Sequence, residues 1–257
     1  MAKHVFNLVP SPVDERDKLY APPFRLFAKP LPASVDLSNT CSSIVDQGNL
    51  GSCTANALVS GVREAMLLKQ QIPYTSLSRL FLYFQERQAE GTTSEDSGAY
   101  LKDGCDILLH TGVCKESTWP YIESKFKVVP PVTSGLEATS FRVLSYAKVT
   151  GVMGMKVALS NGNILASGMA VFSQMESKEA EKTGIVRVPA QGEQNLGGHA
   201  VCCVGYVDTP RGPSYWKGGG YFIMRNSWGL NWGLKGYFKI AYDYVNLGYL
   251  YESWSLA

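Results

Sequence analysis

Apolar residues recur at helical spacing through the first half of the chain. Over residues 53–69 they follow the i, i+3, i+4, i+7 stripe of a helix with one buried face. Weaker versions of the same pattern cover residues 77–89, 97–110 and 152–160. Ser76 or Ser78 would cap the first of these, and Gly112 would end the second. The first half is therefore predicted to be helical.

The pattern changes in the second half, where short apolar runs are bounded by Gly, Pro and Asn. Such runs predict strands joined by loops, and they cover residues 164–172, 184–188, 199–207, 221–226 and 236–242. Loops rather than helices separate most of these runs, which favours an antiparallel sheet over a parallel one. Residues 127–135 have the composition of a linker between the two halves.

Residues 1–33 differ from both halves because they are rich in proline. Proline at this density excludes a continuous helix or a central strand, so we expect an extended arm. The arm could pack along the surface, or it could cross and block an active site. The residues alone do not separate these two alternatives.

Composition and charge argue against two classes of binding partner, nucleic acids and membranes. The chain has 257 residues and a net charge of +2, and it has no dense basic cluster, so a nucleic-acid partner is not expected. No apolar run is long enough to cross a bilayer, so no membrane partner is expected either. The N-terminal residues lack the apolar core of a secretory signal, so we expect an intracellular protein unless it is exported by another route or a leader was removed.

The six cysteines do not form the even framework of a small secreted scaffold. If Cys53 is a free nucleophile, at least one other cysteine is unpaired, and a partial set of disulfides, such as Cys41 with Cys114, is one alternative. Cys202 and Cys203 are adjacent in a predicted strand, so they should point to opposite faces as core residues. No metal-ligand spacing is present, and neither a metal nor a cofactor is expected.

One stretch combines residues that can carry chemistry. Gln47 precedes Cys53 by six residues, and Cys53 opens the predicted helix over 53–69. The first turn of a helix offers unpaired N–H groups and the positive end of the backbone dipole, which favour the nucleophilic thiolate. We expect Cys53 to be a nucleophile and Gln47 to point its amide at the oxygen of the attacked carbonyl.

A cysteine nucleophile needs a base, and the base needs an orienting partner. His199 opens an apolar strand directly after Gly198, where a ligand can approach the backbone closely. Of the other histidines, His4 lies in the arm and His110 near a helix end, so neither is placed as well. Asn226 ends the next strong strand and could orient the imidazole. The Trp-Gly pairs that follow could shield an Asn–His hydrogen bond, or the tryptophans could simply cap the sheet.

In their order along the chain, three segments resemble the papain-like cysteine peptidases. They are Gln47 through Cys53, Gly198 through Tyr206, and Asn226 through Tyr237, with 208–220 as an insertion. The resemblance implies an α+β, two-lobed papain-like fold with the active-site cleft between the lobes. The arm would be residues 1–33 and the peptidase domain residues 34–257. Within the domain, a helical lobe would cover about 34–130 and an antiparallel, barrel-like β lobe about 136–245, followed by a C-terminal segment that crosses back.

The resemblance also implies roles for the candidate catalytic residues. Cys53 would be the nucleophile in a thiolate–imidazolium pair with His199, which Asn226 would orient. Gln47 and the backbone N–H of Cys53 would form the oxyanion hole.

Substrate-binding roles follow from the same resemblance. Ser97 and Gly98 resemble the segment that pairs with an extended substrate, and Gly198 lies at the other edge of the cleft. Trp228 resembles the ring that covers the His–Asn bond on the leaving-group side.

The chain also departs from the usual family pattern. Leu50 replaces a cysteine of many secreted members, Thr54 replaces a tryptophan, and Ser97 replaces the first glycine of a pair. Thr54 and the short arm, with Asp14 and Asp17 near its start, are similar to a xylellain-like branch of bacteria and some viruses. This similarity favours an arm that occludes the cleft.

The leading hypothesis is a cysteine endopeptidase that hydrolyses peptide or protein substrates through a thioester on Cys53. Its own arm would act as an intramolecular inhibitor, as in a zymogen, and the protein would be a monomer. One alternative is an acyl-transfer ligase or transpeptidase that uses the same site. Another is a non-catalytic peptide-binding module on the same fold.

Overall fold

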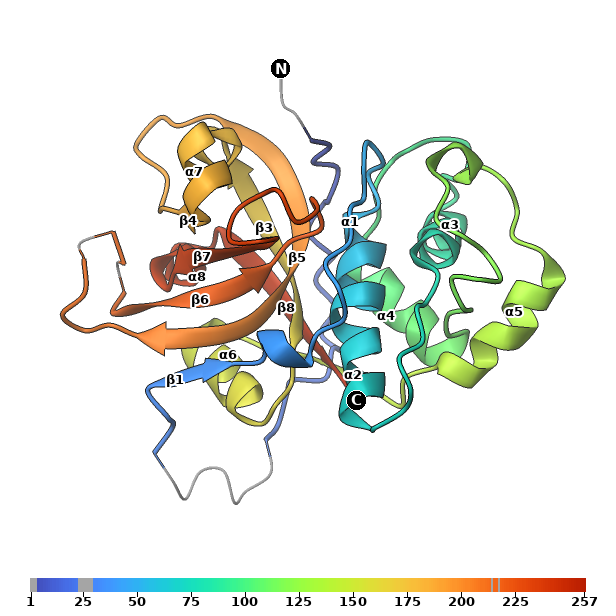
Figure 1. Ribbon diagram of the computed structural model, residues 1–257, viewed down its shortest axis with the longest axis horizontal. Coiled ribbons are helices and arrows are strands. Elements are labelled where there is room, and N and C mark those ends of the chain that lie inside the picture. Colours follow the sequence, from blue (N-terminus) through green and yellow to red (C-terminus); the bar gives the residue numbers. More distant parts are fainter. Residues whose placement is uncertain (1–3, 23–29, 214, 217) are drawn as a thin grey trace.

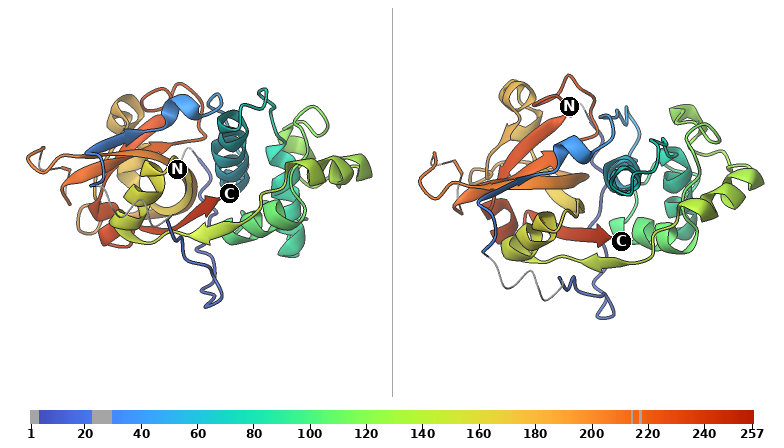
Figure 2. Two further views of the ribbon diagram at one scale, coloured as in Figure 1. Left: turned by 90° about the horizontal axis from the view of Figure 1, so that it is seen from below. Right: turned by 60° about the horizontal axis from the view of Figure 1, so that its bottom comes forward.

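The computed structural model describes residues 4–22, 30–213, 215–216 and 218–257, and Figure 1 shows its two sides. The β-sheet and several short helices lie on one side, further helices lie on the other, and one long helix runs between the two sides. The right-hand view of Figure 2 shows this central helix end-on, between the sheet side and the second group of helices. Residues 1–3 and 23–29 of the predicted arm lie outside the described residues. So do Ser214 and Lys217, which fall in the predicted insertion over 208–220.

The central helix confirms the prediction for residues 53–69. It consists of α1 (Cys53–Ala55), a π-helical segment η3 (Asn56–Arg63) and α2 (Glu64–Lys69) without a break. Its residues from 53 to 65 are all buried, because the sheet covers one side and other helices cover the other. At Gly61, a Cβ atom would lie 2.1 Å from the Cys202 sulfur, so the glycine lets the helix approach the sheet.

The next two helices, α3 (Arg79–Ala89) and α4 (Leu101–His110), pack beside the central helix. The Ser78 side chain accepts the Phe81 N–H, which makes Ser78 the cap of α3. The helix predicted from residue 97 begins later, because Gly98 has a φ of 76° and Tyr100 is extended. Gly112 has a φ of 87° just after α4, as predicted for a helix end.

The remaining helices are short. They are η2 (Ser38–Thr40), η4 (Glu123–Lys125), α5 (Val132–Ala138), η5 (Thr139–Phe141), α6 (Gly151–Ser160), η6 (Ser173–Glu176), α7 (Lys178–Thr183) and α8 (Asp243–Asn246). The linker predicted at 127–135 is wrong at its end, because α5 begins there. Pro131 is its N-cap, and the helix starts where the two prolines no longer remove backbone donors.

The sheet of the described chain runs in the order β2-β8-β3-β5-β6-β7-β4, with β1 paired to β5. Its strands are β1 (Ser34–Asp36), β2 (Tyr146–Lys148), β3 (Leu165–Phe172), β4 (Ile185–Val186), β5 (Asn195–Asp208), β6 (Gly220–Arg225), β7 (Tyr237–Ala241) and β8 (Leu250–Leu256). The pairs are antiparallel except β4 with β7. The five predicted strands are therefore confirmed.

The predicted lobe boundaries need correction at three places. Residues 34–36 form β1 of the sheet, although they were assigned to the helical lobe. The β lobe was expected from about residue 136, which lies inside α5 on the helical side. The segment after residue 245 contains β8, which pairs between β2 and β3 and so completes the sheet. Strand pairing decides the first and third corrections, and the position of α5 decides the second. The local sequence pattern reveals none of these boundaries.

Two hydrophobic clusters lie on the two faces of the sheet. Cys202 belongs to the cluster around the central helix, and Cys203 belongs to the other, as the strand alternation predicted. All six cysteines are unpaired. The alternative of a Cys41–Cys114 disulfide is therefore wrong: the Cys41 thiol faces the Leu37 carbonyl, whereas Cys114 is fully buried where its carbonyl accepts the Ser78 N–H. Within the described ranges, no helix is long and apolar enough to cross a membrane.

Candidate active site

Cys53 is the first residue of the central helix, at the junction with the sheet. It is fully buried, and burial raises the pKa of its thiol to about 12. The backbone N–H groups of Ala200, Thr54 and Cys53 itself act in the opposite direction, because they hydrogen-bond to the thiolate. The helix start thus favours the thiolate as predicted, but in this state burial outweighs it.

His199 lies in β5, one residue before Ala200, whose N–H reaches the Cys53 sulfur. The His199 Nε2 atom is 2.9 Å from Asn226 Oδ1, and that oxygen also accepts the Ser227 N–H at 2.8 Å. Since Oδ1 can only accept, Nε2 carries the ring proton and Nδ1 is the basic nitrogen. His199 Nδ1 has no hydrogen-bond partner among the described residues, so it is available to take a proton from the thiol.

The surroundings of His199 keep it neutral. Burial lowers the pKa of the imidazole to about 4, against the opposing effect of the Asn226 hydrogen bond. The Trp228 ring stacks on His199 with centroids 4.8 Å apart and an interplanar angle of 25°. Trp228 therefore packs against the His199 ring, and its role over the His–Asn bond stays a prediction. With the arm over the site, burial thus favours a neutral thiol and a neutral imidazole, and the thiolate–imidazolium pair stays a prediction.

Gln47 is fully buried beside these residues. Its Oε1 accepts the Ser227 hydroxyl at 2.6 Å, and its backbone N–H donates to the Ser227 carbonyl at 2.9 Å. Its Nε2 donates to the Leu50 carbonyl at 3.0 Å. An amide nitrogen carries two hydrogens, so this bond leaves the second one for another acceptor. Gln47 is thereby attached to the segment that also carries Asn226 and Trp228.

The predicted substrate-binding residues fall into two groups. The Ser97 hydroxyl faces Thr92 Oγ1 at 2.8 Å and the Gly98 carbonyl at 3.0 Å. Gly98 and Gly198 instead border the arm. A Cβ at Gly98 would lie 2.3 Å from the Asn7 carbonyl oxygen, and one at Gly198 would lie 2.2 Å from that of Leu8. Both positions therefore need glycine for an extended chain to pass. Their contact with substrate stays a prediction.

The first part of the arm passes directly over the site. The His4 ring stacks on Trp228 with centroids 4.0 Å apart, and the Phe6 ring lies edge-on to His199 at 6.1 Å. The Leu8 N–H donates to the Gly198 carbonyl at 3.2 Å, and its side chain is only 4% exposed, in the same cluster as Cys53. In Figure 1 this dark-blue segment runs between the sheet and the central helix.

The arm continues along the protein and is attached at several further points. Lys102 forms ion pairs with Asp14 at 2.8 Å and Asp17 at 2.6 Å, so both arm aspartates share one lysine of α4. Farther on, the Tyr20 N–H donates to the Lys148 carbonyl at 2.8 Å. The seated arm is therefore fixed both at the site and away from it.

Two residues near the site, Glu86 and Asp96, were not predicted from the sequence. Glu86 is fully buried in α3 and accepts the Thr54 hydroxyl at 2.7 Å, and burial raises the pKa of its carboxyl well above the usual value. This contact accounts for threonine at the position after Cys53. Asp96 accepts the Gly51 N–H. The sequence offered two signals. Glu86 is a carboxylate among the apolar residues of the 77–89 helix, and Asp96 directly precedes Ser97.

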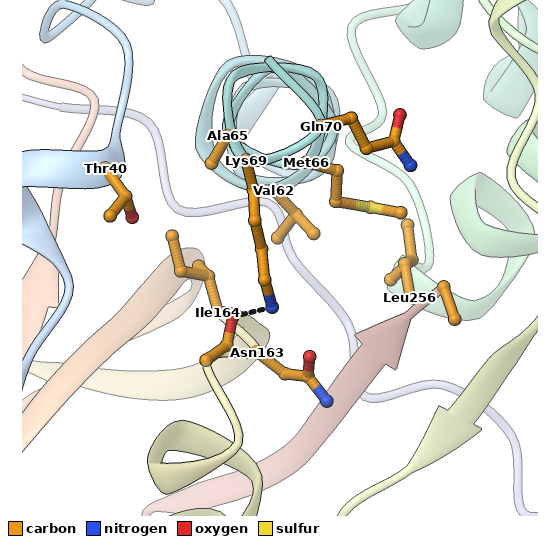
Figure 3. A pocket seen from close by; sticks show the side chains of 11 residues that line it. Thr40, Val62, Ala65, Met66, Lys69, Gln70, Asn163, Ile164 and Leu256 are labelled. Carbon is orange, nitrogen blue, oxygen red and sulfur yellow. Dashed lines mark hydrogen bonds between the residues drawn. The ribbon is translucent and has the colours of Figure 1, made fainter.

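Open space also lies away from the predicted site. A cavity of about 420 Å³ lies at the other end of the central helix, away from Cys53. Figure 3 shows its walls, where Val62, Met66 and Lys69 of the helix face Ile164 and Leu256. The Lys69 ammonium donates to the Gly162 carbonyl at 3.0 Å. This cavity contains none of the predicted site residues.

Comparison with known proteins agrees with this geometry. A family model described as "Papain family cysteine protease" matches residues 31–253. The chain belongs to the papain family. The predicted family and the α+β papain-like fold are thereby confirmed.

Two relatives lie in the branch that the sequence suggested. An uncharacterized peptidase C1-like protein of Acanthamoeba polyphaga mimivirus is 38% identical over 212 residues, which cover 79% of this papain-family chain and 65% of the viral protein. The chain thus spans less than two thirds of that relative. The structure of xylellain, a cysteine protease from Xylella fastidiosa, matches with a TM-score of 0.89 and 31% identity, covering 99% of this chain and 96% of that one.

A more distant structure shares the fold alone. Digestive procathepsin L 3 from the larval midgut of Tenebrio molitor matches with a TM-score of 0.68 and 22% identity, and the match covers 89% of this chain and 71% of that one.

Proposed function

We propose that this chain is a cysteine endopeptidase whose nucleophile is Cys53 and whose general base is His199. The observation that carries the proposal is the protonation pattern of His199. Asn226 holds Nε2 as a donor, and Nδ1 is left without a partner among the described residues, one residue from the N–H that reaches the Cys53 sulfur. A base prepared in this way can accept a thiol proton.

The reaction follows from these positions. His199 Nδ1 takes the Cys53 proton as the sulfur attacks the carbonyl carbon of a peptide bond. Negative charge then develops on the carbonyl oxygen, where the second Nε2 hydrogen of Gln47 and the backbone N–H of Cys53 would stabilise it. The imidazolium gives its proton to the leaving amine, which departs and leaves a thioester. Water attacks the thioester with His199 again as base, and the acid product and free thiol are released.

We infer a peptide substrate from the edges of the site. Gly98 and Gly198 flank an extended segment of the protein's own arm, and Gly198 hydrogen-bonds its backbone. Backbone pairing at exposed edges is a general way to bind an extended peptide. A substrate would need to take the place of Phe6–Leu8.

We also propose that the seated arm keeps the enzyme latent. Cys53 and His199 are both fully buried, and Leu8 and Phe6 are among the residues that cover them. Burial also favours the neutral thiol over the nucleophilic thiolate. Activity would therefore require the arm to leave the site.

The test uses the full chain with Leu8→Ala, which loosens the arm without touching the proposed catalytic residues. We expect this variant to hydrolyse a mixture of fluorogenic peptides, and the Leu8→Ala, Cys53→Ser double variant to be inactive. Adding an amine acceptor shows whether acyl transfer competes with hydrolysis. A Leu8→Ala protein that exposes Cys53 but cleaves no peptide would contradict the proposal.

A further inference from the structure

One peptide group before the nucleophile is held from both sides. The carbonyl of Leu50 accepts the side-chain amide of Gln47 at 3.0 Å. On the other side of the same peptide, the Gly51 N–H lies 3.0 Å from each carboxylate oxygen of Asp96. Asp96 and Gln47 are thus connected through a single planar unit.

The Asp96 carboxylate is itself fixed in place. The Tyr83 hydroxyl donates to Asp96 Oδ1 at 2.5 Å and also accepts the Gly98 N–H at 3.2 Å. The Arg87 guanidinium lies over the Tyr83 ring, 4.2 Å from its centroid, and donates to the Glu95 carbonyl at 3.0 Å. Tyr83 and Arg87 are fully buried. The carboxylate therefore has little freedom to follow Gly51 if that peptide turns.

This arrangement determines which way the Leu50–Gly51 peptide faces. If the peptide turned over, its N–H would point at Gln47 Nε2, donor against donor, and its carbonyl would point at the Asp96 carboxylate. Both contacts would be repulsive. In the observed orientation, the hydrogen bond to an ionised acceptor is of the stronger kind, and it polarises the peptide so that its carbonyl binds the Gln47 amide more firmly.

We propose that Asp96 is a positioning residue for the oxyanion hole, because it orients the Gln47 amide through the Leu50–Gly51 peptide. This inference rests on the proposed role of Gln47. The Asp96 backbone carbonyl accepts the Asn7 side-chain amide of the arm at 2.8 Å. The Asp96 carboxylate faces the Gly51 N–H and acts only by holding the donor that stabilises the developing charge. It also joins this loop to the Gly98 edge through Tyr83.

Two reactions of the Cys53 sulfur distinguish a loss of Gln47 positioning from a general disturbance of the site. Acylation by p-nitrophenyl acetate passes through a tetrahedral oxyanion. Alkylation by iodoacetamide displaces iodide at a saturated carbon and forms no oxyanion. Both rates are measured in the full chain carrying Leu8→Ala, which leaves Gln47 and Asp96 untouched.

In this parent, Asp96→Ala is expected to slow acylation about 10- to 100-fold, the scale of a displaced reacting group, and to leave alkylation unchanged. Asp96→Asn keeps one oxygen for Gly51 and should lose less. Tyr83→Phe is the matched control: it removes the hydroxyl but keeps the Asp96–Gly51 bond, and it should also lose less. Gln47→Ala is expected to slow acylation by about 10²- to 10³-fold, and adding Asp96→Ala should then cost little more.

Three results would overturn the inference. Equal losses of acylation and alkylation in Asp96→Ala and Asp96→Asn would mean that Cys53 itself has moved. Unchanged acylation in Asp96→Ala would remove the role altogether, and so would full additivity with Gln47→Ala. Failure of the proposed function would give different results. Cys53 of the Leu8→Ala parent would be alkylated but not acylated, or the Gln47→Ala variant with Asp96 intact would be acylated at the normal rate.

Discussion

Leu8→Ala tests how tightly the arm is held at the site. The Leu8 side chain is only 4% exposed and packs in the cluster that contains Cys53. Alanine removes three carbons, which at about 0.8 kcal/mol per buried group amounts to about 2.4 kcal/mol. Since about 1.4 kcal/mol corresponds to a factor of ten, the fraction of molecules with a displaced arm should rise about 50-fold.

The assay is the rate at which iodoacetamide labels Cys53 in the full chain, read by mass spectrometry of the peptide that contains it. The Cys53 side chain is fully buried, so labelling requires the arm to move, and the rate should follow the open fraction. Leu19→Ala is the matched control, because Leu19 is in the same arm but 66% exposed. It should label at the rate of the unaltered protein.

The reasoning would be refuted by either of two results. If Leu8→Ala labels no faster than the unaltered protein, the arm does not limit access to Cys53. If Leu19→Ala rises as much as Leu8→Ala, the gain comes from a general loosening of the arm and not from the buried contact. A larger rise at the other cysteines than at Cys53 would point to partial unfolding.

Three further outcomes are expected. While the arm is seated, burial holds the pKa of His199 at about 4, below its ordinary 6.5, so the open state binds one more proton between these values. The arm should be held above pH 6.5 and released as the pH falls toward 4, seen as lost hydrogen-exchange protection of residues 4–8 after correction for intrinsic rates. The response should vanish in His199→Gln, and a pH-independent arm would contradict the argument. Lys102→Met removes the partner of Asp14 and Asp17 and should raise Cys53 labelling a few-fold, less at high salt; an unchanged rate at low salt would show that these pairs do not hold the arm. Asn226→Ala, added to Leu8→Ala, removes the bond that orients His199 and should slow alkylation about 2- to 10-fold; equal rates would mean that the ring is oriented without it.

Local pattern alone determined the main elements and the candidate chemistry. The helix over 53–69 has a repeating apolar stripe, and the strands are short apolar runs between glycines and prolines, so both could be predicted from neighbouring residues. Cys53, His199 and Asn226 could be selected because each stands at the start or end of a predicted element. The family followed from the same segments, and the matching of residues 31–253 confirms it.

Only the tertiary structure decided the contacts that act on this chemistry. β8 joins the sheet between β2 and β3, because strand pairing with distant residues overrides local composition. The neutral state of Cys53 and His199 comes from burial among segments that are far apart in the sequence, and Phe6 of the arm lies edge-on to the His199 ring. Likewise, nothing near Asp96 in the chain indicates that its carboxylate meets Gly51. Such contacts form between loops that are distant in the sequence, so the spacing of the residues along the chain does not predict them.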